Sequence, residues 1–175
     1  MKNPIAPTNR EVTVNAEDFI VSKTDLKGRI TYANRLFMEI SGYREIELLG
    51  EQHNIVRHPD MPRGIFHLLW QTVMQGNECF AYVKNLCKYG DHYWVLANIT
   101  PDYDARDQII GYYSVRRCAT RDAVEYFTAL YREMRTAEQR AGTREAIAAS
   151  SEILETAIKE QGFENYESFI FGHQA

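Results

Sequence analysis

Apolar and polar residues alternate with a period of two in several short stretches of the chain, and this pattern predicts β-strands. The first two stretches lie on either side of a tight turn predicted at Lys27-Gly28, within TDLKGRITYAN. Two later stretches, CFAYVKNLCK and DHYWVLANIT, are separated by a hairpin signal at Tyr89-Gly90. A fifth, QIIGYYSVRRCAT, follows a polar connection. The pattern therefore predicts five strands.

Helices are predicted between the second and the third strand. Asn34 can cap a short helix with its side chain, and Gly42 ends that helix because glycine accepts a left-handed backbone. Beyond Pro62, apolar residues recur at helical spacing as far as Gly76: Ile65, Leu68, Leu69, Trp70 and Val73. The order of elements predicts an α+β fold, in which one five-stranded antiparallel sheet carries helices on one face.

The C-terminal part of the chain is predicted to be helical. Two apolar stripes follow Thr120, and the segment Ala141-Gly142-Thr143 between them is the expected corner. The first stripe comprises Val124, Phe127, Leu130, Tyr131 and Met134, and the second comprises Ile147, Ile153, Leu154, Ala157 and Ile158. We therefore divide the chain into a loosely held N-terminal extension (1–17), a mixed α/β domain (18–120) and a C-terminal helical hairpin (121–175).

Composition restricts the kinds of protein that this chain can be. Hydrophobic residues make up 45% and charged residues 25% of its 175 residues, as in ordinary globular proteins. The net charge of −4 gives no reason to expect a nucleic acid or an anionic membrane as partner. The sequence shows neither a long apolar run nor a signal peptide, which predicts a cytoplasmic protein without membrane insertion. Cys79, Cys87 and Cys118 have no metal-binding spacing.

Two asparagines in the strands are candidate ligand-binding residues. Asn85 interrupts an apolar stretch, and Asn98 shares a strand face with Trp94. A buried carboxamide without a partner costs about 1–3 kcal/mol. A flat heterocycle with C=O and N–H edges, such as the pyrimidine end of a flavin, would satisfy it. The strand pattern alone leaves equally open that both asparagines face water on the open side of the sheet.

A second candidate is the segment HNIVRHPDMP, in which Arg57, His58 and Asp60 lie on a loop held by Pro59 and Pro62. A guanidinium can bind a ligand phosphate through its planar fork of donors. His58 and Asp60 can bind ligand hydroxyls or each other. From the residues alone, a solvated loop with a weak Arg–Asp ion pair is the more ordinary interpretation.

Signatures of catalysis are missing from the sequence. No pair of acidic residues is placed for acid–base chemistry, and no serine lies in a G-x-S-x-G segment. Gly28, Gly42 and Gly50 are isolated and do not form a phosphate-binding loop. Any of the five histidines could ligate heme, but a lone histidine is more often structural or exposed. We therefore expect a protein that is not an enzyme and that does not hold heme.

Four motifs of the chain are also found together in a known family. D-x-x-G-x-I-x-x-A-N and F-x-x-x-S-G-Y are general PAS motifs, and H-N-x-V-R-H-P-D-M-P followed by V-K-N…K-x-G-D-H-Y-W-V-x-A-N is more specific. Over about residues 18–120 the chain closely resembles the PAS domain of bacterial aerotaxis receptors, in the branch that binds FAD. The resemblance implies a PAS fold with FAD between the sheet and a cap of short helices. FMN is less consistent with it.

The resemblance also implies which residues contact the flavin. They are Asn34, Arg57, His58, Asp60, Trp70, Asn85, Tyr93 and Asn98, with His53 in the covering helix as a weaker addition. Two-residue alternation places Tyr93 on the opposite strand face from Asn98, which counts against Tyr93. Trp70 and Tyr93 fit equally well as core aromatic residues.

The function that the resemblance implies is a redox or oxygen sensor of the aerotaxis type. Such a module would pass the redox state of its flavin to a downstream signalling protein, and the helices after Arg121 are the expected recipient. The apolar stripes of these helices suit a homodimer or, alternatively, a cover for the outer face of the sheet. A cofactor-free interaction module and a heme-binding gas sensor are competing interpretations, and a flavin-dependent reductase is a third.

Overall fold

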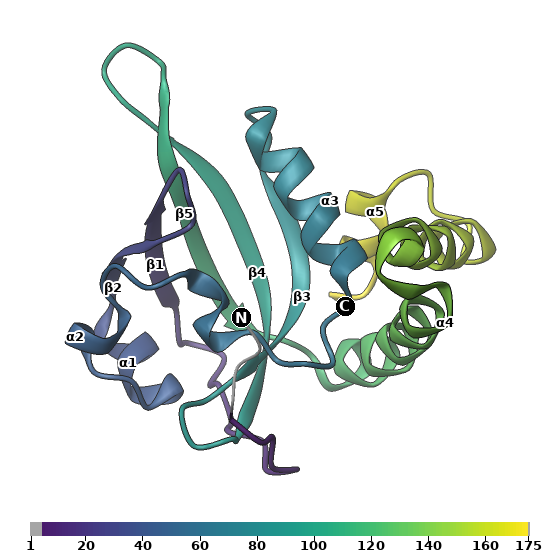
Figure 1. The fold of residues 1–175 in the computed structure, drawn as a ribbon, viewed down its shortest axis with the longest axis horizontal. Helices are drawn as coiled ribbons and strands as arrows, with labels where there is room; N and C mark the ends of the chain where they lie inside the picture. Colours follow the sequence, from purple (N-terminus) through teal and green to yellow (C-terminus); the bar gives the residue numbers. More distant parts are fainter. Residues whose placement is uncertain (1–4, 175) are drawn as a thin grey trace.

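Five antiparallel strands form a single sheet in the computed structural model, which describes residues 5–174 (Figure 1). The strands are β1 (Ile20–Asp25), β2 (Ile30–Ala33), β3 (Cys79–Leu86), β4 (His92–Tyr103) and β5 (Ile109–Cys118). Their spatial order is β2-β1-β5-β4-β3, so the chain closes the sheet by placing its last strand between the first and the fourth. The predicted five-stranded antiparallel sheet is confirmed.

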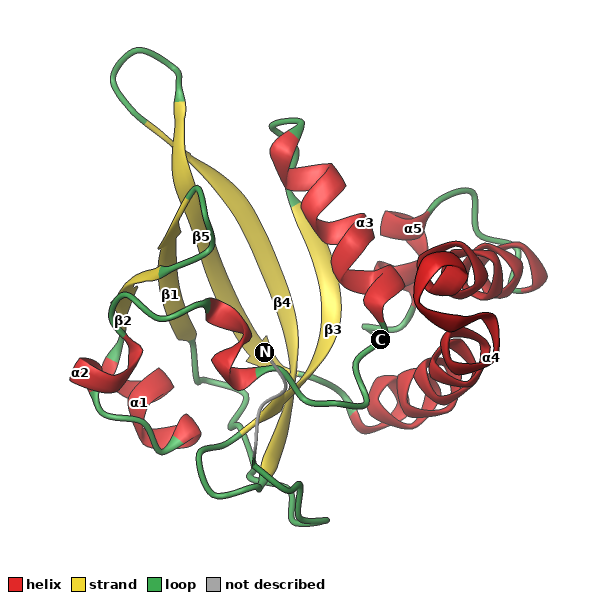
Figure 2. Cartoon of the chain, viewed as in Figure 1, coloured by secondary structure: helices red, strands yellow, loops and turns green. Residues whose placement is uncertain are grey.

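The connection between β2 and β3 supplies the helices that accompany the sheet (Figure 2). They are α1 (Arg35–Ser41), α2 (Glu45–Leu48), the 3-10 helix η1 (His53–Val56) and α3 (Arg63–Met74). Asn34 caps α1 as predicted, since its Oδ1 accepts from the backbone N–H of Phe37 at 3.0 Å. We call the sheet face that η1 and α3 cover the inner face.

The pairing register decides which side chains reach the inner face. Asn85 of β3 pairs with Tyr93 of β4, and Ala97 of β4 pairs with Arg116 of β5. Because side chains alternate along each strand, members of a pair lie on the same face. Arg116 lies opposite Ile20 in β1. The inner face therefore carries an arginine and an asparagine among apolar neighbours.

The C-terminal region forms the predicted helical hairpin. α4 (Arg121–Glu160) changes direction at Gly142, whose φ of 73° and ψ of 178° are not helical, and Figure 1 shows the two arms on either side of this bend. A short helix α5 (Tyr166–Gly172) follows. The first stripe packs on the outer face of the sheet: Phe127 stacks on Tyr82 with 4.5 Å between ring centroids, and the Tyr131 hydroxyl donates to the Tyr82 carbonyl at 2.7 Å. This stripe covers the sheet within one chain.

The N-terminal extension is held more firmly than its composition predicts. The backbone N–H of Thr8 donates to Gly90 and that of Val12 donates to His92, each at 2.7 Å. Arg10 forms an ion pair with Asp91. The expectation of a loosely held segment is wrong for this part, because the extension lies along the turn between β3 and β4. Residues 1–4 of the extension lie outside the described residues.

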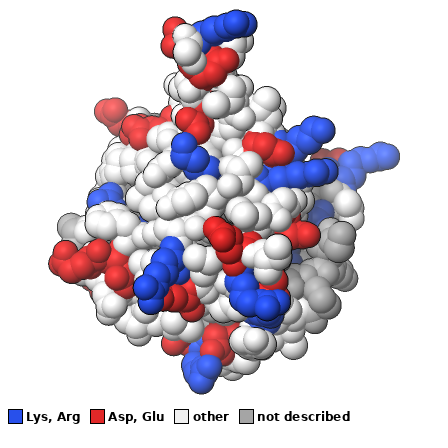
Figure 3. All heavy atoms as spheres, turned by 90° about the vertical axis from the view of Figure 1, so that its left-hand side faces the viewer, with Lys and Arg blue, Asp and Glu red and all other residues white. Residues whose placement is uncertain are grey.

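The surface of the molecule carries charges of both signs. On the side that Figure 3 shows, lysine and arginine side chains are interspersed with aspartate and glutamate side chains, and no large area has a single sign. This distribution agrees with the small net charge of −4 and offers no basic surface for a nucleic acid on that side. Within residues 5–174, no helix has the length and apolar character that crossing a membrane requires.

Candidate functional site

A cavity of about 220 Å³ lies between the inner face of the sheet and the helices η1 and α3. Its sheet side is formed by Thr24, Val83, Asn85, Ala97, Ile99, Tyr112, Ser114 and Arg116. Its helix side is formed by His53, Asn54, Val56, Arg57, Phe66, Leu69 and Trp70, and Gly28 and Gln52 complete the lining. Aliphatic and aromatic walls with a few polar groups are typical of sites for small organic ligands.

Arg116 contributes a buried positive charge to the cavity wall. The residue is 2% exposed, its Nε donates to Ser114 Oγ at 3.1 Å, and its Nη2 contacts Ser22 Oγ and His53 Nε2. Among residues 5–174, no carboxylate forms an ion pair with it and its Nη1 has no hydrogen-bond partner. Burial lowers its pKa to about 10, so the guanidinium stays charged at neutral pH. A buried cation without an anion is costly unless a ligand compensates it.

His53 is held in one protonation state by its neighbours. Its Nε2 lies 2.9 Å from Arg116 Nη2 and 3.1 Å from Ser22 Oγ, and its ring stacks on Phe37 with 5.9 Å between centroids. A guanidinium can only donate, so Nε2 must accept and the ring proton lies on Nδ1. Burial, followed by the charge of Arg116, lowers the pKa of His53 to about 3. The imidazole is therefore neutral at pH 7.

Asn85 and Arg57 lie side by side at another part of the lining. Asn85 is 4% exposed, and no hydrogen bond joins its carboxamide to any other residue that the structure describes. The backbone of Arg57 bridges to that of Asn85. The Arg57 guanidinium lies 4.2 Å from the centroid of the Phe66 ring and donates to the Met61 carbonyl at 3.0 Å. Two polar side chains at the cavity are therefore available to a ligand.

Trp70 of α3 and Tyr112 of β5 form an aromatic part of the wall. Their rings meet edge to face, with 5.2 Å between centroids. Nearby on β1, the hydroxyl of Thr24 is buried without a hydrogen-bond partner. The cavity thus brings together four residues predicted from the sequence, His53, Arg57, Trp70 and Asn85.

The structure corrects the placement of the strand residues Asn98 and Tyr93. Asn98 pairs with Phe80 on the outer face, and its amide donates to the Glu78 carboxylate at 2.9 Å. Tyr93 shares the inner face with Asn85 and is fully buried, but it does not line the cavity. Alternation within each strand was predicted correctly. The phase between the two strands depends on the hairpin register, which the sequence pattern does not specify.

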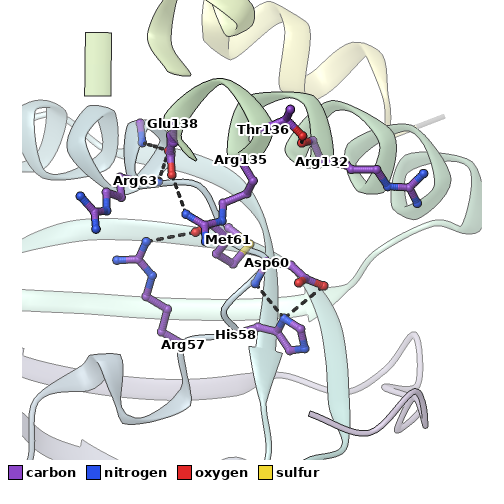
Figure 4. A network of polar contacts seen from close by, with 10 residues as sticks. Arg57, His58, Asp60, Met61, Arg63, Arg132, Arg135, Thr136 and Glu138 are labelled. Carbon is purple, nitrogen blue, oxygen red and sulfur yellow. Dashed lines mark hydrogen bonds and ion pairs between the residues drawn. The ribbon is translucent and has the colours of Figure 1, made fainter. Parts of the chain in front are cut away.

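Three further predicted residues lie away from the cavity. Asn34 is occupied as a helix cap, and its Oδ1 also accepts from the backbone N–H of Val21 at 3.1 Å. Asp60 forms an ion pair with Lys84 at 2.7 Å and borders a second cavity, of about 400 Å³, which residues of α4 also line. His58 is buried, and its Nδ1 accepts from the backbone N–H of Asp60 at 3.1 Å (Figure 4). The loop therefore turns Arg57 alone toward the first cavity.

Burial governs the protonation of this loop. It lowers the pKa of His58 to about 4, an effect that the charge of Lys84 strengthens. His58 is therefore neutral at pH 7, and its contact of 3.4 Å with Asp60 is a dipolar one rather than an ion pair. Within residues 5–174, no group of three His, Cys, Asp or Glu side chains is placed to hold a metal ion.

Sequence reasoning missed Arg116, Ser22 and Ser114. Each occupies an inner position of its strand at a period of two residues, in SKTD and YYSVRRC. Polar residues at every second position of an otherwise apolar strand are the signal that could have identified them. Arg116 and Arg117 are adjacent, and only the register shows which of them points inward.

Comparisons with known proteins establish the family. A family model described as the PAS fold matches residues 8–119, so the chain belongs to the PAS-fold family. The match begins ten residues before the predicted domain and includes the part of the extension that contacts β4. The predicted PAS fold is therefore confirmed.

Two curated proteins are similar in sequence to this chain. It is 40% identical over 127 residues to the aerotaxis receptor of Escherichia coli (strain K12). The aligned residues make up 73% of this chain and 25% of that receptor. It is 30% identical over 97 residues to a nitrogen fixation regulatory protein of Klebsiella pneumoniae, covering 55% of this chain and 20% of that protein. The chain spans a quarter or less of these relatives' lengths. Both names are those of sensory or regulatory proteins.

Solved structures support the same fold. A light-oxygen-voltage domain studied with a flavin analogue has a TM-score of 0.56 and 20% identity, over 63% of this chain and 83% of that one. The light state of the photoreceptor aureochrome1 has a TM-score of 0.56 and 19% identity, over 65% and 90% of the two chains. At this level of identity the likeness concerns the fold alone.

Proposed function

We propose that this chain is a cytoplasmic sensor module that binds FAD in the cavity and passes the redox state of the flavin to a signalling partner. The observation that carries the proposal is a pair of polar groups at the cavity that have no hydrogen-bond partner among the described residues, Nη1 of Arg116 and the carboxamide of Asn85. Both are buried, and both leave donors unused that a ring with carbonyl and ring-nitrogen acceptors would employ. The aerotaxis receptor as a relative, and a neighbour studied with a flavin analogue, support the choice of ligand.

The lining residues suit the parts of a flavin in different ways. Asn85 and Arg116 would bind the polar edge of the ring, while Trp70, Leu69 and Val83 would contact its apolar body. The cavity volume of about 220 Å³ lies below the ~300–1,000 Å³ of typical ligand pockets. We therefore expect the ring inside and the phosphates outside, next to Arg57, which favours FAD or FMN over a larger macrocycle such as heme.

A bound flavin would supply a ring that accepts electrons and whose edge gains a proton on reduction. The side chains around it can respond in defined ways. The Asn85 carboxamide has both a donor and an acceptor and can present either one by rotating. His53 and Arg116 hold fixed hydrogen-bond roles, because one is neutral and the other only donates. Asn85 is thus the adjustable member of the site.

The output of the module is proposed to be a conformational signal rather than a reaction product. No residue of the cavity forms a pair suited to acid–base catalysis, and we do not expect turnover. A signalling protein, or a homodimer, would receive the signal through surfaces other than the first stripe of α4, because that stripe is buried against the sheet in this chain.

The proposal is tested by an absorption spectrum of the purified protein, together with mass spectrometry of the ligand released by acid. We expect flavin absorption and the mass of FAD. A colourless protein that takes up no FAD after ligand removal would support a cofactor-free interaction module. A Soret band would support heme, and release of FMN would correct the cofactor while leaving the sensor function in place.

A further inference from the structure

α3 begins without a capping side chain of its own. Its N-cap position is Pro62, and its first turn contains no acidic residue. The carboxylate of Glu138, in the first arm of α4, takes that place: Oε1 accepts from the backbone N–H groups of Arg63 at 2.5 Å and Gly64 at 3.3 Å (Figure 4). Glu138 is 4% exposed, and its Oε2 accepts from Arg135 at 2.8 Å. A distant helix therefore caps α3.

The second arm of α4 packs against the same end of α3. A methyl group at Gly64 would lie 2.6 Å from Oγ and 2.9 Å from Cβ of Ser150, which is closer than side chains approach. Ser150 is fully buried. Only glycine at position 64 allows this contact. The N-terminus of α3 is thus hydrogen-bonded to Glu138 of the first arm and packed against Ser150 of the second arm.

The N-terminus of α3, which contacts α4, is connected to the cavity by a short segment. Arg57 lines the cavity, and its Nη2 donates to the carbonyl of Met61, directly before the N-cap of α3 (Figure 4). Farther along α3, Phe66 and Trp70 form part of the cavity wall. One loop and one turn of helix therefore connect Arg57 and the cavity wall to the Glu138 contact.

We infer that Glu138 positions α3 over the cavity and thereby couples ligand binding in the cavity to the docking of α4. The inference rests on the proposed function, since FAD is the ligand concerned. A phosphate bound by Arg57 would share the guanidinium with the Met61 carbonyl, which accepts from Nη2, and would thereby act on the loop that leads to α3. Coupling between two sites is reciprocal, so weakening the Glu138 contact changes the affinity for FAD.

A cap that serves stability alone would give different results, and three variants separate the two possibilities. Glu138→Ala removes every contact of the carboxylate, whereas Glu138→Gln keeps an oxygen that can accept from α3 but loses the charge that pairs with Arg135. Glu133→Ala, at an exposed glutamate of the same arm, is the matched control. Each variant is stripped of ligand and titrated with FAD, and amide hydrogen exchange of α4 is compared with and without FAD.

We expect Glu138→Ala to change the affinity for FAD by about fivefold or more, Glu138→Gln to change it less, and Glu133→Ala to match the wild type. We also expect FAD to alter hydrogen exchange in α4 of the wild type and not in Glu138→Ala. Identical affinities in Glu138→Ala and Glu133→Ala, with no effect of FAD on α4, would overturn the inference. If Glu138→Ala does not fold, Glu138→Gln decides by the same comparison.

A measurement without ligand separates failure of this inference from failure of the proposed function. In a Trp94→Phe background, Trp70 of α3 is the one remaining tryptophan of the sequence, and acrylamide quenching reports its exposure at the cavity wall. We expect stronger quenching in Glu138→Ala than in Glu133→Ala. A wild type that binds no FAD refutes the proposed function and the coupling to FAD, and equal quenching refutes the positioning role of Glu138.

Discussion

Replacing Arg116 by methionine tests whether its charge serves a ligand or the fold. Burial lowers the pKa of Arg116 from 12.5 to about 10. At about 1.4 kcal/mol per pKa unit, keeping the cation buried costs ~3 kcal/mol in the ligand-free protein. Methionine removes this cost and also the hydrogen bonds to Ser114, Ser22 and His53, each from a charged donor and worth about 1.5–3 kcal/mol. The lost hydrogen bonds outweigh the relieved burial cost, so we expect the free energy of unfolding to fall by about 1.5 kcal/mol or more.

Ligand binding should respond differently. A hydrogen bond from a charged donor contributes about 1.5–3 kcal/mol, which corresponds to a 10- to 100-fold loss of FAD affinity in Arg116→Met, to order of magnitude. Flavin fluorescence gives the affinity, and urea unfolding of the ligand-free protein gives the stability. A loss of stability in Arg116→Met together with unchanged FAD affinity would refute the reasoning and assign Arg116 to the fold.

Three other predictions follow from the geometry. Asn85→Leu should weaken FAD binding about tenfold, whereas Asn98→Leu, on the outer face, should leave the affinity unchanged in the same titration; equal effects would contradict the placement of the two residues. The pKa of His53 is lowered to about 3 in the folded protein, so below about pH 6.5 the unfolded state binds more protons than the folded state. The free energy of unfolding therefore falls as the pH decreases, and at pH 5 it is lower than at neutral pH by roughly 2 kcal/mol. Urea unfolding should show a weaker pH dependence in His53→Gln than in wild type. Gly142→Ala should lower the free energy of unfolding by about 1–3 kcal/mol, since φ 73° and ψ 178° suit glycine alone. An unchanged melting temperature would argue against the bend of α4 at this residue.

Much of the fold could be predicted from periodicity and capping signals. The five strands, the α1 cap at Asn34, the helix that follows Pro62 and the bend at Gly142 all carry local signals, and each was found where predicted. These features depend on residues close in sequence. The firm attachment of the N-terminal extension was not predicted, because it depends on backbone hydrogen bonds to a turn about 80 residues away.

The site was predicted less completely, for a geometric reason. His53, Arg57, Trp70 and Asn85 line the cavity, whereas Asn34, His58, Asp60, Tyr93 and Asn98 do not. Whether a strand residue faces inward depends on the register between strands, and a shift of one residue reverses the answer. Arg116 was missed for this reason, and Asn98 was assigned to the wrong face. The Glu138 contact joins two helices distant in sequence and leaves no local signal.

The central claim is that a flavin ring binds between the inner face of the sheet and the helices η1 and α3. A crystal structure of the protein saturated with FAD tests it most directly. The account predicts an acceptor atom of the ring about 2.7–3.2 Å from Arg116 Nη1, the Asn85 carboxamide hydrogen-bonded to the ring edge, and phosphate next to Arg57. A flavin bound elsewhere, or a cavity filled by the protein's own side chains at saturating FAD, would contradict it.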